Sequence, residues 1–286
     1  MDFAEFRKKY TPLVDDYLET NIAKEADSKL AEIMAYSVMA GGKRLRPLLF
    51  LATCDALGKK IDEATLRAAC GIELIHTYSL IHDDLPAMDN SPLRRGKASS
   101  HVKWGEAQAI LAGDGLLPLG LEWIAEGTDS AKAAAMMAKA IGPNGMVGGQ
   151  YLDIDATNNE SRAHDQAFID RMEWRKTGCL LQACVEIPLA WLDASKEQRE
   201  ALSTFAKDFG RSYQIYDDLV DVFETDEEAG KNTHEDEEAG KNNTLTLLGV
   251  KKSQDALSSL IKDANKALAD NYPVLSGFLN LYQRVL

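Results

Sequence analysis

Three aspartates and two arginines fall within the thirteen residues DDLPAMDNSPLRR. They are Asp83, Asp84, Asp89, Arg94 and Arg95. Carboxylates this close repel one another, and protonation, exposure to water or a divalent cation relieves the repulsion. The arginines favour the last remedy, because a site with both carboxylates and guanidinium groups suits an anion that carries metal ions. The residue types therefore predict a site for phosphate or diphosphate together with Mg²⁺.

A second acidic cluster lies in the segment YQIYDDLVD and consists of Asp217, Asp218 and Asp221. A separation of four places Asp217 and Asp221 on one face of a helix, a turn apart. Like charges at that spacing destabilise a helix unless a cation lies between them. The second cluster therefore also indicates a cation site.

The first cluster cannot lie on one regular helical face. Pro86 and the separation of six between Asp83 and Asp89 break the helical spacing, so Asp89 must return from a loop or be turned inward by a bulge. Two carboxylate clusters on separate helices that face one cavity would hold several Mg²⁺ ions, each completed by phosphate oxygens and water. For either cluster alone, an exposed acidic helix end is the alternative.

The overall charge limits the partners of the protein. The 286 residues include 45 Asp and Glu against 32 Lys and Arg, a formal net charge of −13 with a pI of about 4.9. This balance disfavours nucleic acid and anionic membrane surfaces, although a small anion can bind where cations are concentrated. No stretch approaches the roughly 18 apolar residues that span a bilayer, and the N-terminus lacks the apolar segment of a signal peptide. We therefore expect a cytoplasmic protein without a membrane span.

The elements that must position these clusters are helices. Apolar residues recur at helical spacing over residues 30–39, stop at Gly41 and Gly42, and resume after Pro47. Further helical patterns cover residues 63–84, 131–141, 197–224 and 252–272. Strand patterns are almost missing, so we predict an all-α protein, a single large bundle of roughly ten helices around a central cavity. Two loops interrupt the pattern, at residues 84–101 and 224–243.

Several motifs occur in an order that resembles one family. The motifs are GGKRLRP at 41–47, ELIHTYSLIHDDLPAMD at 73–89, LRRG at 93–96, GMVGGQYLDI at 145–154, RKTG at 175–178, YQIYDDLVDV at 213–222 and GK at 230–231. Over about residues 25 to 250 the chain resembles the trans-prenyltransferases, the isoprenyl diphosphate synthases. The two extra residues in DDLPAMD, compared with a plain DDxxD, are typical of the bacterial farnesyl diphosphate (geranyltranstransferase) branch.

The resemblance implies a fold and an activity. The fold would be of the isoprenoid synthase type, with residues 1–286 as a single polyprenyl synthetase domain. The activity would be that of a short-chain trans-prenyltransferase, which condenses isopentenyl diphosphate with dimethylallyl or geranyl diphosphate to give farnesyl diphosphate. The steps would be Mg²⁺-assisted ionisation, condensation and proton elimination. About three Mg²⁺ ions per site and a homodimer are implied by the family.

The same resemblance assigns roles to individual residues. Metal binding would fall to Asp83, Asp84, Asp89, Asp217, Asp218 and Asp221. Isopentenyl diphosphate would be bound by Lys43, Arg46, His76 and Arg95, and the allylic diphosphate by Arg94, Lys176, Thr177, Gln214, Lys231 and Lys241. Lys176, Thr177 and Gln214 would also stabilise the allylic cation. Lys241 matches least well, because the sequence departs from the family pattern after Lys231.

Product length is predicted to depend on Tyr78 and Ser79. In a helix over residues 71–82 they would lie roughly 6 to 8 Å from Asp83 along the axis, since each residue rises about 1.5 Å. A chain growing along this helix from the metal-bound diphosphate would meet a ring there. In the family, a bulky residue at this position or the two-residue insertion stops growth early. Ordinary core packing of Tyr78 is the alternative.

Two other functions are compatible with parts of the pattern. A class I terpene cyclase on the same fold also uses an aspartate-rich motif with Mg²⁺, but it needs no second cationic pocket, so Lys43, Arg46, His76 and Arg95 argue against it. A non-catalytic helical subunit that assists a partner synthase would be expected to lose carboxylates from one cluster. Neither cluster has lost one.

Overall fold

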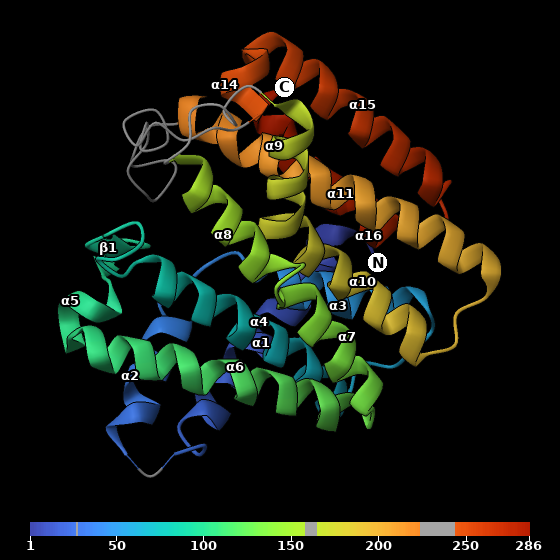
Figure 1. The fold of residues 1–286 in the computed structure, drawn as a ribbon. Helices are drawn as coiled ribbons and strands as arrows, with labels where there is room; N and C mark the ends of the chain where they lie inside the picture. The colour runs from blue at the N-terminus through green and yellow to red at the C-terminus, as the bar shows by residue number, and fades with distance from the viewer. Residues whose placement is uncertain (27, 158–164, 224–243) are drawn as a thin grey trace. The chain divides into compact units, whose positions relative to one another are not determined.

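The computed structural model describes residues 1–26, 28–157, 165–223 and 244–286. Helices make up almost all of the regular structure in these ranges, so the all-α prediction is confirmed (Figure 1). The chain divides into two compact units: the N-terminal unit, residues 5–134, and the C-terminal unit, residues 1–4 with 135–286. The predicted single domain around a central cavity stays a prediction. No helix in the described ranges is long and apolar enough to cross a membrane.

The N-terminal unit contains three long helices, several shorter ones and a small hairpin. Its helices are α1 (Phe3–Ile22), α2 (Lys29–Val38), α3 (Leu45–Ala56), α4 (Glu63–Asp83), α5 (Ser100–Trp104), α6 (Glu106–Thr128) and the start of α7 (Ala131–Ile141). Between α4 and α5, the two-residue strands β1 (Leu93–Arg94) and β2 (Lys97–Ala98) pair antiparallel. Arg95 and Gly96 join them with φ of 55° and 74°, as the tightest hairpin turns require.

Helix α3 begins at Leu45, so the prediction that the helix resumes after Pro47 was wrong. Proline at the third helical position removes no hydrogen bond, because the first N–H groups of a helix have no acceptor within it. Arg46 therefore lies in the first turn of a helix. The predicted helices over residues 30–39 and 63–84 are confirmed by α2 and α4.

Helices α4 and α6 lie side by side in Figure 1 and approach so closely that glycine is required at the contact. A β-carbon added at Gly120 would lie 2.6 Å from the carbonyl oxygen of Gly71, and one at Gly71 would lie 2.6 Å from that of Gly120. Distances of this size are below any van der Waals contact. The two backbones therefore touch, which fixes the position of the helix that ends in the first aspartate cluster.

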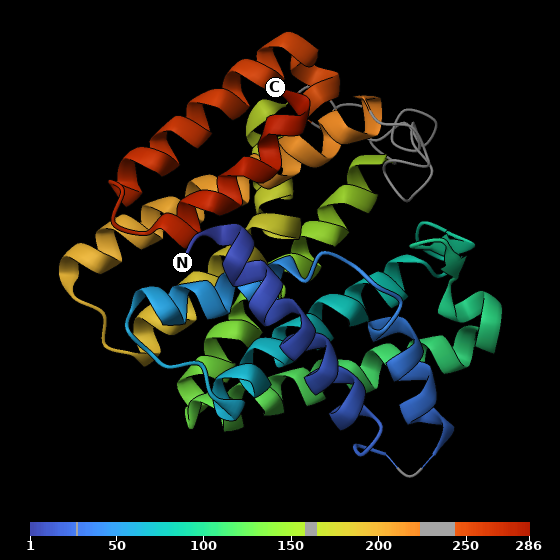
Figure 2. The same ribbon diagram turned by 180° about the vertical axis from the view of Figure 1, so that it is seen from behind.

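The C-terminal unit is built on one long helix. Its elements are α8 (Met146–Thr157), α9 (Gln166–Glu173), the π-helical turn η2 (Trp174–Gly178), α10 (Cys179–Trp191), α11 (Lys196–Phe223), α14 (Thr244–Leu248), α15 (Val250–Leu268), α16 (Pro273–Phe278) and the 3-10 helix η3 (Leu279–Val285). Helix α15 runs along α11, as both views show (Figure 2). These two helices confirm the patterns predicted over residues 197–224 and 252–272.

An aromatic cluster fixes α11 against the C-terminal elements. The ring of Phe209 lies 5.5 Å from that of Tyr282 and 6.1 Å from that of Phe278. The buried hydroxyl of Tyr282 donates a hydrogen bond of 2.9 Å to the carbonyl oxygen of Phe209. Burial of these rings and the hydrogen bond together hold the helix that carries the second aspartate cluster.

We predict that Gly120→Ala destabilises the protein by about 1 to 3 kcal/mol, because the new methyl group meets backbone and cannot be accommodated. In an ordinary helix the same change is favourable by about 1 kcal/mol. Gly115→Ala in the same helix is the control, since its β-carbon would meet only the flexible end of Met34, at 3.1 Å. Urea unfolding measures both variants. Equal stabilities would contradict the close contact of α4 and α6.

Candidate active site

The first aspartate cluster lies where α4 ends. Asp83 is the last residue of the helix and Asp84 is its C-cap. The backbone N–H of Asp89 donates a hydrogen bond of 2.9 Å to the carbonyl oxygen of Asp83. The chain therefore turns back after Pro86 and returns Asp89 to the helix end, which confirms the prediction made from the spacing. Asp84 is only 3% exposed, whereas Asp89 lies at the surface.

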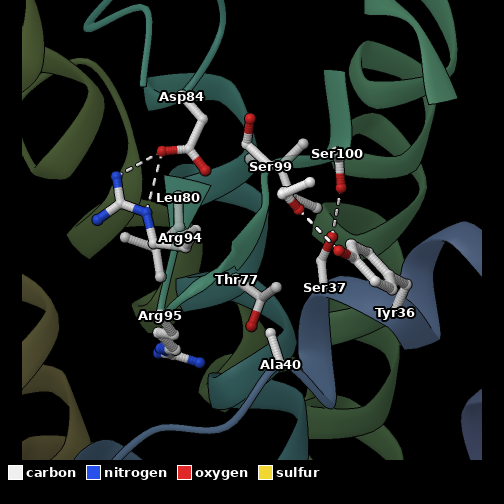
Figure 3. A pocket seen from close by; sticks show the side chains of 12 residues that line it. Tyr36, Ser37, Ala40, Thr77, Leu80, Asp84, Arg94, Arg95, Ser99 and Ser100 are labelled. Carbon is white, nitrogen blue, oxygen red and sulfur yellow. Dashed lines mark hydrogen bonds and ion pairs between the residues drawn. The ribbon is translucent and has the colours of Figure 1, made fainter. Parts of the chain in front are cut away.

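Arg94 forms an ion pair with Asp84. Its Nε and Nη2 atoms donate to the same carboxylate oxygen, at 2.9 and 2.5 Å (Figure 3). Burial raises the pKa of Asp84, while the guanidinium of Arg94 opposes the rise. Two residues that the sequence assigned separately, one to metal and one to diphosphate, are thus in direct contact.

The hairpin that carries Arg94 and Arg95 is tied to α2. The hydroxyl of Tyr36 donates a 2.7 Å hydrogen bond to the carbonyl oxygen of Ala98, and the hydroxyls of Ser37 and Ser100 lie 2.6 Å apart (Figure 3). Beneath the hairpin lies a cavity of about 20 Å³, enough for one water molecule. The two arginines therefore extend from an anchored turn.

The segment GGKRLRP forms a tight loop against Arg95. Gly41 and Gly42 have φ of 106° and 124°, which side-chain-bearing residues rarely adopt. The guanidinium of Arg95 donates to the carbonyl oxygen of Gly41. A β-carbon at Gly42 would lie 2.6 Å from the centre of that guanidinium. The paired glycines thus allow the loop and Arg95 to meet, with the exposed Lys43 next in the chain.

Arg46 and His76 are also in contact, since Arg46 Nη1 donates to His76 Nε2 at 3.2 Å. A guanidinium cannot accept, so Nε2 is unprotonated and Nδ1 carries the ring proton. Burial, reinforced by Arg46 and Arg95, holds the pKa of His76 well below its usual range. Burial and neighbouring arginines also lower the pKa of Arg95. The structure therefore brings together Arg46, His76, Arg95 and the loop of Lys43 as a cationic cluster in an acidic chain.

In the C-terminal unit, Lys176 and Thr177 lie in a π-helical turn, a feature that often marks functional sites. The Thr177 hydroxyl donates to Gln214 Oε1 at 2.9 Å, and Gln214 Nε2 donates to Asp218 Oδ1 at 2.8 Å. This chain of hydrogen bonds orients the Gln214 side chain and joins it to the second aspartate cluster. The sequence predicted these residues but not the π turn or their connection.

Glycines let the neighbouring helices approach the π turn. A β-carbon at Gly149 of α8 would lie 2.6 Å from the carbonyl carbon of Arg175, so α8 touches the backbone of the turn. A β-carbon at Gly210 of α11 would lie 3.2 Å from the Cα atom of Gly178. Gln214 follows Gly210 by one helical turn, which places it beside Thr177.

Asp153 is a residue that the sequence reasoning missed. Its carboxylate lies 2.5 Å from Lys176 Nζ and is largely buried. The available signal was weak: an acid four residues after Gly149, on the same face of α8. Lys176, like Arg94, is therefore held by a carboxylate of the chain.

Asp217, Asp218 and Asp221 all lie on α11, and Asp218 and Asp221 are only 2% and 4% exposed. Carboxylate oxygens are the donors that Mg²⁺ prefers, so the residues fit the predicted ion. Within the described ranges, no three His, Cys, Asp or Glu side chains are grouped closely enough to hold a metal alone. An ion bound here would take further oxygens from diphosphate and water, as Mg²⁺ commonly does.

Some predicted features are not tested by this geometry. Lys231 and Lys241 lie outside the described residues. The two aspartate clusters belong to different units, so their approach to one cavity stays a prediction. Tyr78 is 5% exposed, and its ring makes an edge contact with His82 at 5.8 Å. Ser79 donates to the carbonyl oxygen of His76, and the role of Tyr78 and Ser79 in product length stays a prediction.

Comparison with known proteins gives a consistent result. Residues 27–274 match the family model described as polyprenyl synthetase. A farnesyl diphosphate synthase of Geobacillus stearothermophilus is 42% identical over 252 residues, 85% of this chain and 83% of the relative. Geranylgeranyl pyrophosphate synthase 7, chloroplastic, of Arabidopsis thaliana is 36% identical over 272 residues, 93% of this chain and 78% of the relative.

A solved structure agrees. The geranyltransferase of Helicobacter pylori, complexed with magnesium and isoprenyl diphosphate, is 29% identical with a TM-score of 0.78, and the alignment covers 98% of this chain and 96% of that one. This chain belongs to the polyprenyl synthetase family, the trans-prenyltransferases, and has the helical isoprenoid synthase fold.

We predict that the imidazole of His76 stays neutral at pH 6 and that its pKa rises in Arg46→Met, because one positive neighbour is removed. NMR titration of the ring nitrogens measures both values. Folding lowers the pKa of His76, so the neutral ring contributes to the free energy of unfolding. This contribution is fully present above the pKa of histidine in the unfolded chain, about 6.5, and is lost as the pH falls below that value. A His76 pKa near 6.5 in the unaltered protein would contradict the burial of the ring, and an unchanged pKa in Arg46→Met would contradict the contact with Arg46.

Proposed function

We propose that the protein condenses isopentenyl diphosphate with dimethylallyl or geranyl diphosphate and that its main product is farnesyl diphosphate. The cationic cluster formed by Arg46, His76, Arg95 and the Lys43 loop carries the proposal, because it supplies cations for a second diphosphate besides Arg94, which is paired with Asp84. The farnesyl product is supported by the DDLPAMD motif and by the 42% identical relative of that name. A homodimer in the cytoplasm remains part of the proposal.

In the first step the allylic substrate ionises. The aspartates of the two clusters would hold Mg²⁺, which would supply positive charge that makes the diphosphate a better leaving group. Arg94 and Lys176 bind the same diphosphate, joined in the proposal by Lys231 and Lys241. The allylic C–O bond breaks and its electron pair stays with the diphosphate. The Thr177 hydroxyl, the backbone carbonyl of Lys176 and the Gln214 side-chain oxygen stabilise the carbocation, and the 2.9 Å hydrogen bond holds Thr177 and Gln214 together.

In the second step the double bond of isopentenyl diphosphate attacks the cation. Lys43, Arg46 and Arg95 hold its diphosphate through charge, and neutral His76 donates from Nδ1. A new C–C bond forms, and the resulting cation loses a proton to the departed diphosphate. No side chain is needed as a general base.

The two alternative functions are less well supported. A terpene cyclase has one diphosphate to bind and no use for the Arg46–His76 contact beside Arg95. A non-catalytic subunit has no use for a complete Thr177–Gln214–Asp218 chain. An assay with both substrates separates the proposed function from these two, since only a prenyltransferase lengthens the chain by five carbons.

We predict that the protein, with Mg²⁺, isopentenyl diphosphate and geranyl diphosphate, forms a fifteen-carbon product, and that Asp217→Ala lowers turnover by roughly 100-fold or more. The variant loses a metal ligand needed for ionisation, while circular dichroism should show unchanged helices. Asp255→Ala, at an exposed position of α15, is the control and should retain its turnover. Near-normal turnover of Asp217→Ala would overturn the role of the second cluster.

We further predict that Tyr78→Ala shifts the main product to twenty carbons or more, because loss of the buried ring opens space for another five-carbon unit. Tyr78→Phe keeps the ring and should retain the fifteen-carbon product. Chromatography of the products from both variants gives the chain lengths. An active Tyr78→Ala enzyme that still makes a fifteen-carbon product would show that another residue limits the length of the product.

A further inference from the structure

Arg44 has no role in the assignments above, yet it is the most constrained residue of the GGKRLRP loop. It is 3% exposed and precedes the first residue of α3. Its backbone is left-handed, with φ of 49°, a conformation that residues with a β-carbon rarely adopt. Such a conformation persists only where the surroundings enforce it, and it is found preferentially at ligand sites.

Two carboxylates from two helices enforce this conformation. Arg44 Nε donates to Asp15 Oδ1 of α1 at 2.7 Å, and Nη1 donates to Glu73 Oε1 of α4 at 3.0 Å. Glu73 is 2% exposed, so this half of the contact is shielded from water. A planar guanidinium bound from two directions has a fixed orientation, and it fixes the backbone that carries it.

The residues of the cationic cluster lie on either side of Arg44. Lys43 precedes Arg44, and Arg46 follows it by two residues in the first turn of α3. Glu73 precedes His76 by three residues on α4, so the two side chains are neighbours on that helix. The Arg44–Glu73 and Arg46–His76 contacts therefore tie the loop to α4 at two adjacent points.

We propose that Arg44, through Glu73 and Asp15, is a positioning residue for the binding of isopentenyl diphosphate. This inference rests on the proposed function. Arg44 is buried, so it holds the loop without touching substrate. With the loop already ordered, Lys43 and Arg46 bind the diphosphate without the entropic cost of arranging them. The chain as a whole is acidic, so it can bind a small anion only where cations are concentrated. If the loop moved, Lys43 and Arg46 would leave the cluster and the anion would be bound less well.

The test is Arg44→Lys, which keeps the charge but loses the two-directional contact. Calorimetry with isopentenyl diphosphate and Mg²⁺ should show a Kd raised roughly tenfold, because Lys43 and Arg46 would then have to be ordered on binding. The KM for isopentenyl diphosphate should rise by a similar factor. The KM for geranyl diphosphate should stay within about twofold. Arg67→Lys is the control and should leave the Kd unchanged, because Arg67 of α4 also pairs with two carboxylates, at 2.6 Å from Glu126 of α6 and 3.8 Å from Glu25, but lies outside the GGKRLRP loop.

The outcomes separate this inference from the function on which it rests. If the unaltered protein binds no isopentenyl diphosphate, the proposed function fails. If it binds and a folded Arg44→Lys variant binds equally well, or if both KM values rise together, the positioning role is overturned. If Arg44→Lys does not fold, Asp15→Ala replaces it with the same expectation, since the side chain of Asp15 is 40% exposed and its loss removes one of the two contacts that orient Arg44 while Glu73 stays paired.

Discussion

Two cations assigned to the binding of diphosphate, Arg94 and Lys176, each lie against a buried carboxylate of the same unit. A charged carboxylate can be kept in a protein interior only if its charge is compensated, and Arg94 does this for Asp84 as Lys176 does for Asp153. A diphosphate that binds Arg94 must compete with Asp84 for the guanidinium. Asp84 would then lack its partner, and Mg²⁺ is the charge that can replace it. In the proposed enzyme this exchange explains why anion and metal are needed together.

Around these ion pairs, segments of the chain approach one another very closely, and glycine permits the close approach. Gly42 makes room for the guanidinium of Arg95, and Gly149 lets α8 reach the turn that holds Lys176. A side chain at either position would displace a cation that the proposed mechanism uses. These glycines therefore contribute to function by their lack of volume, in the same way that Gly71 and Gly120 set the spacing of α4 and α6.

The sequence predicted the long elements and missed the short ones, for physical reasons. Helices such as α11 and α15 have enough turns for apolar periodicity to be visible. The return of Asp89 could be predicted, because Pro86 and the spacing of six left few alternatives. The hairpin at residues 93–98 has two-residue strands, which are too short to show any alternation. The π turn and the pairing of Asp153 with Lys176 depend on packing between distant segments.

The position of Tyr78 on α4 determines the direction in which a product chain would have to grow if this residue limits its length. Five residues turn about 140° around a helix, so Tyr78 does not lie on the same face of α4 as Asp83. Its ring contacts His82, and His82 Nε2 lies 3.1 Å from the carbonyl oxygen of Ile110 in α6. A β-carbon at Gly113 of α6 would overlap the ring of His82, whose Cδ2 atom would be only 2.6 Å away. A product chain stopped by Tyr78 would therefore have to grow toward α6, and the close spacing of α4 and α6 would keep the ring from yielding.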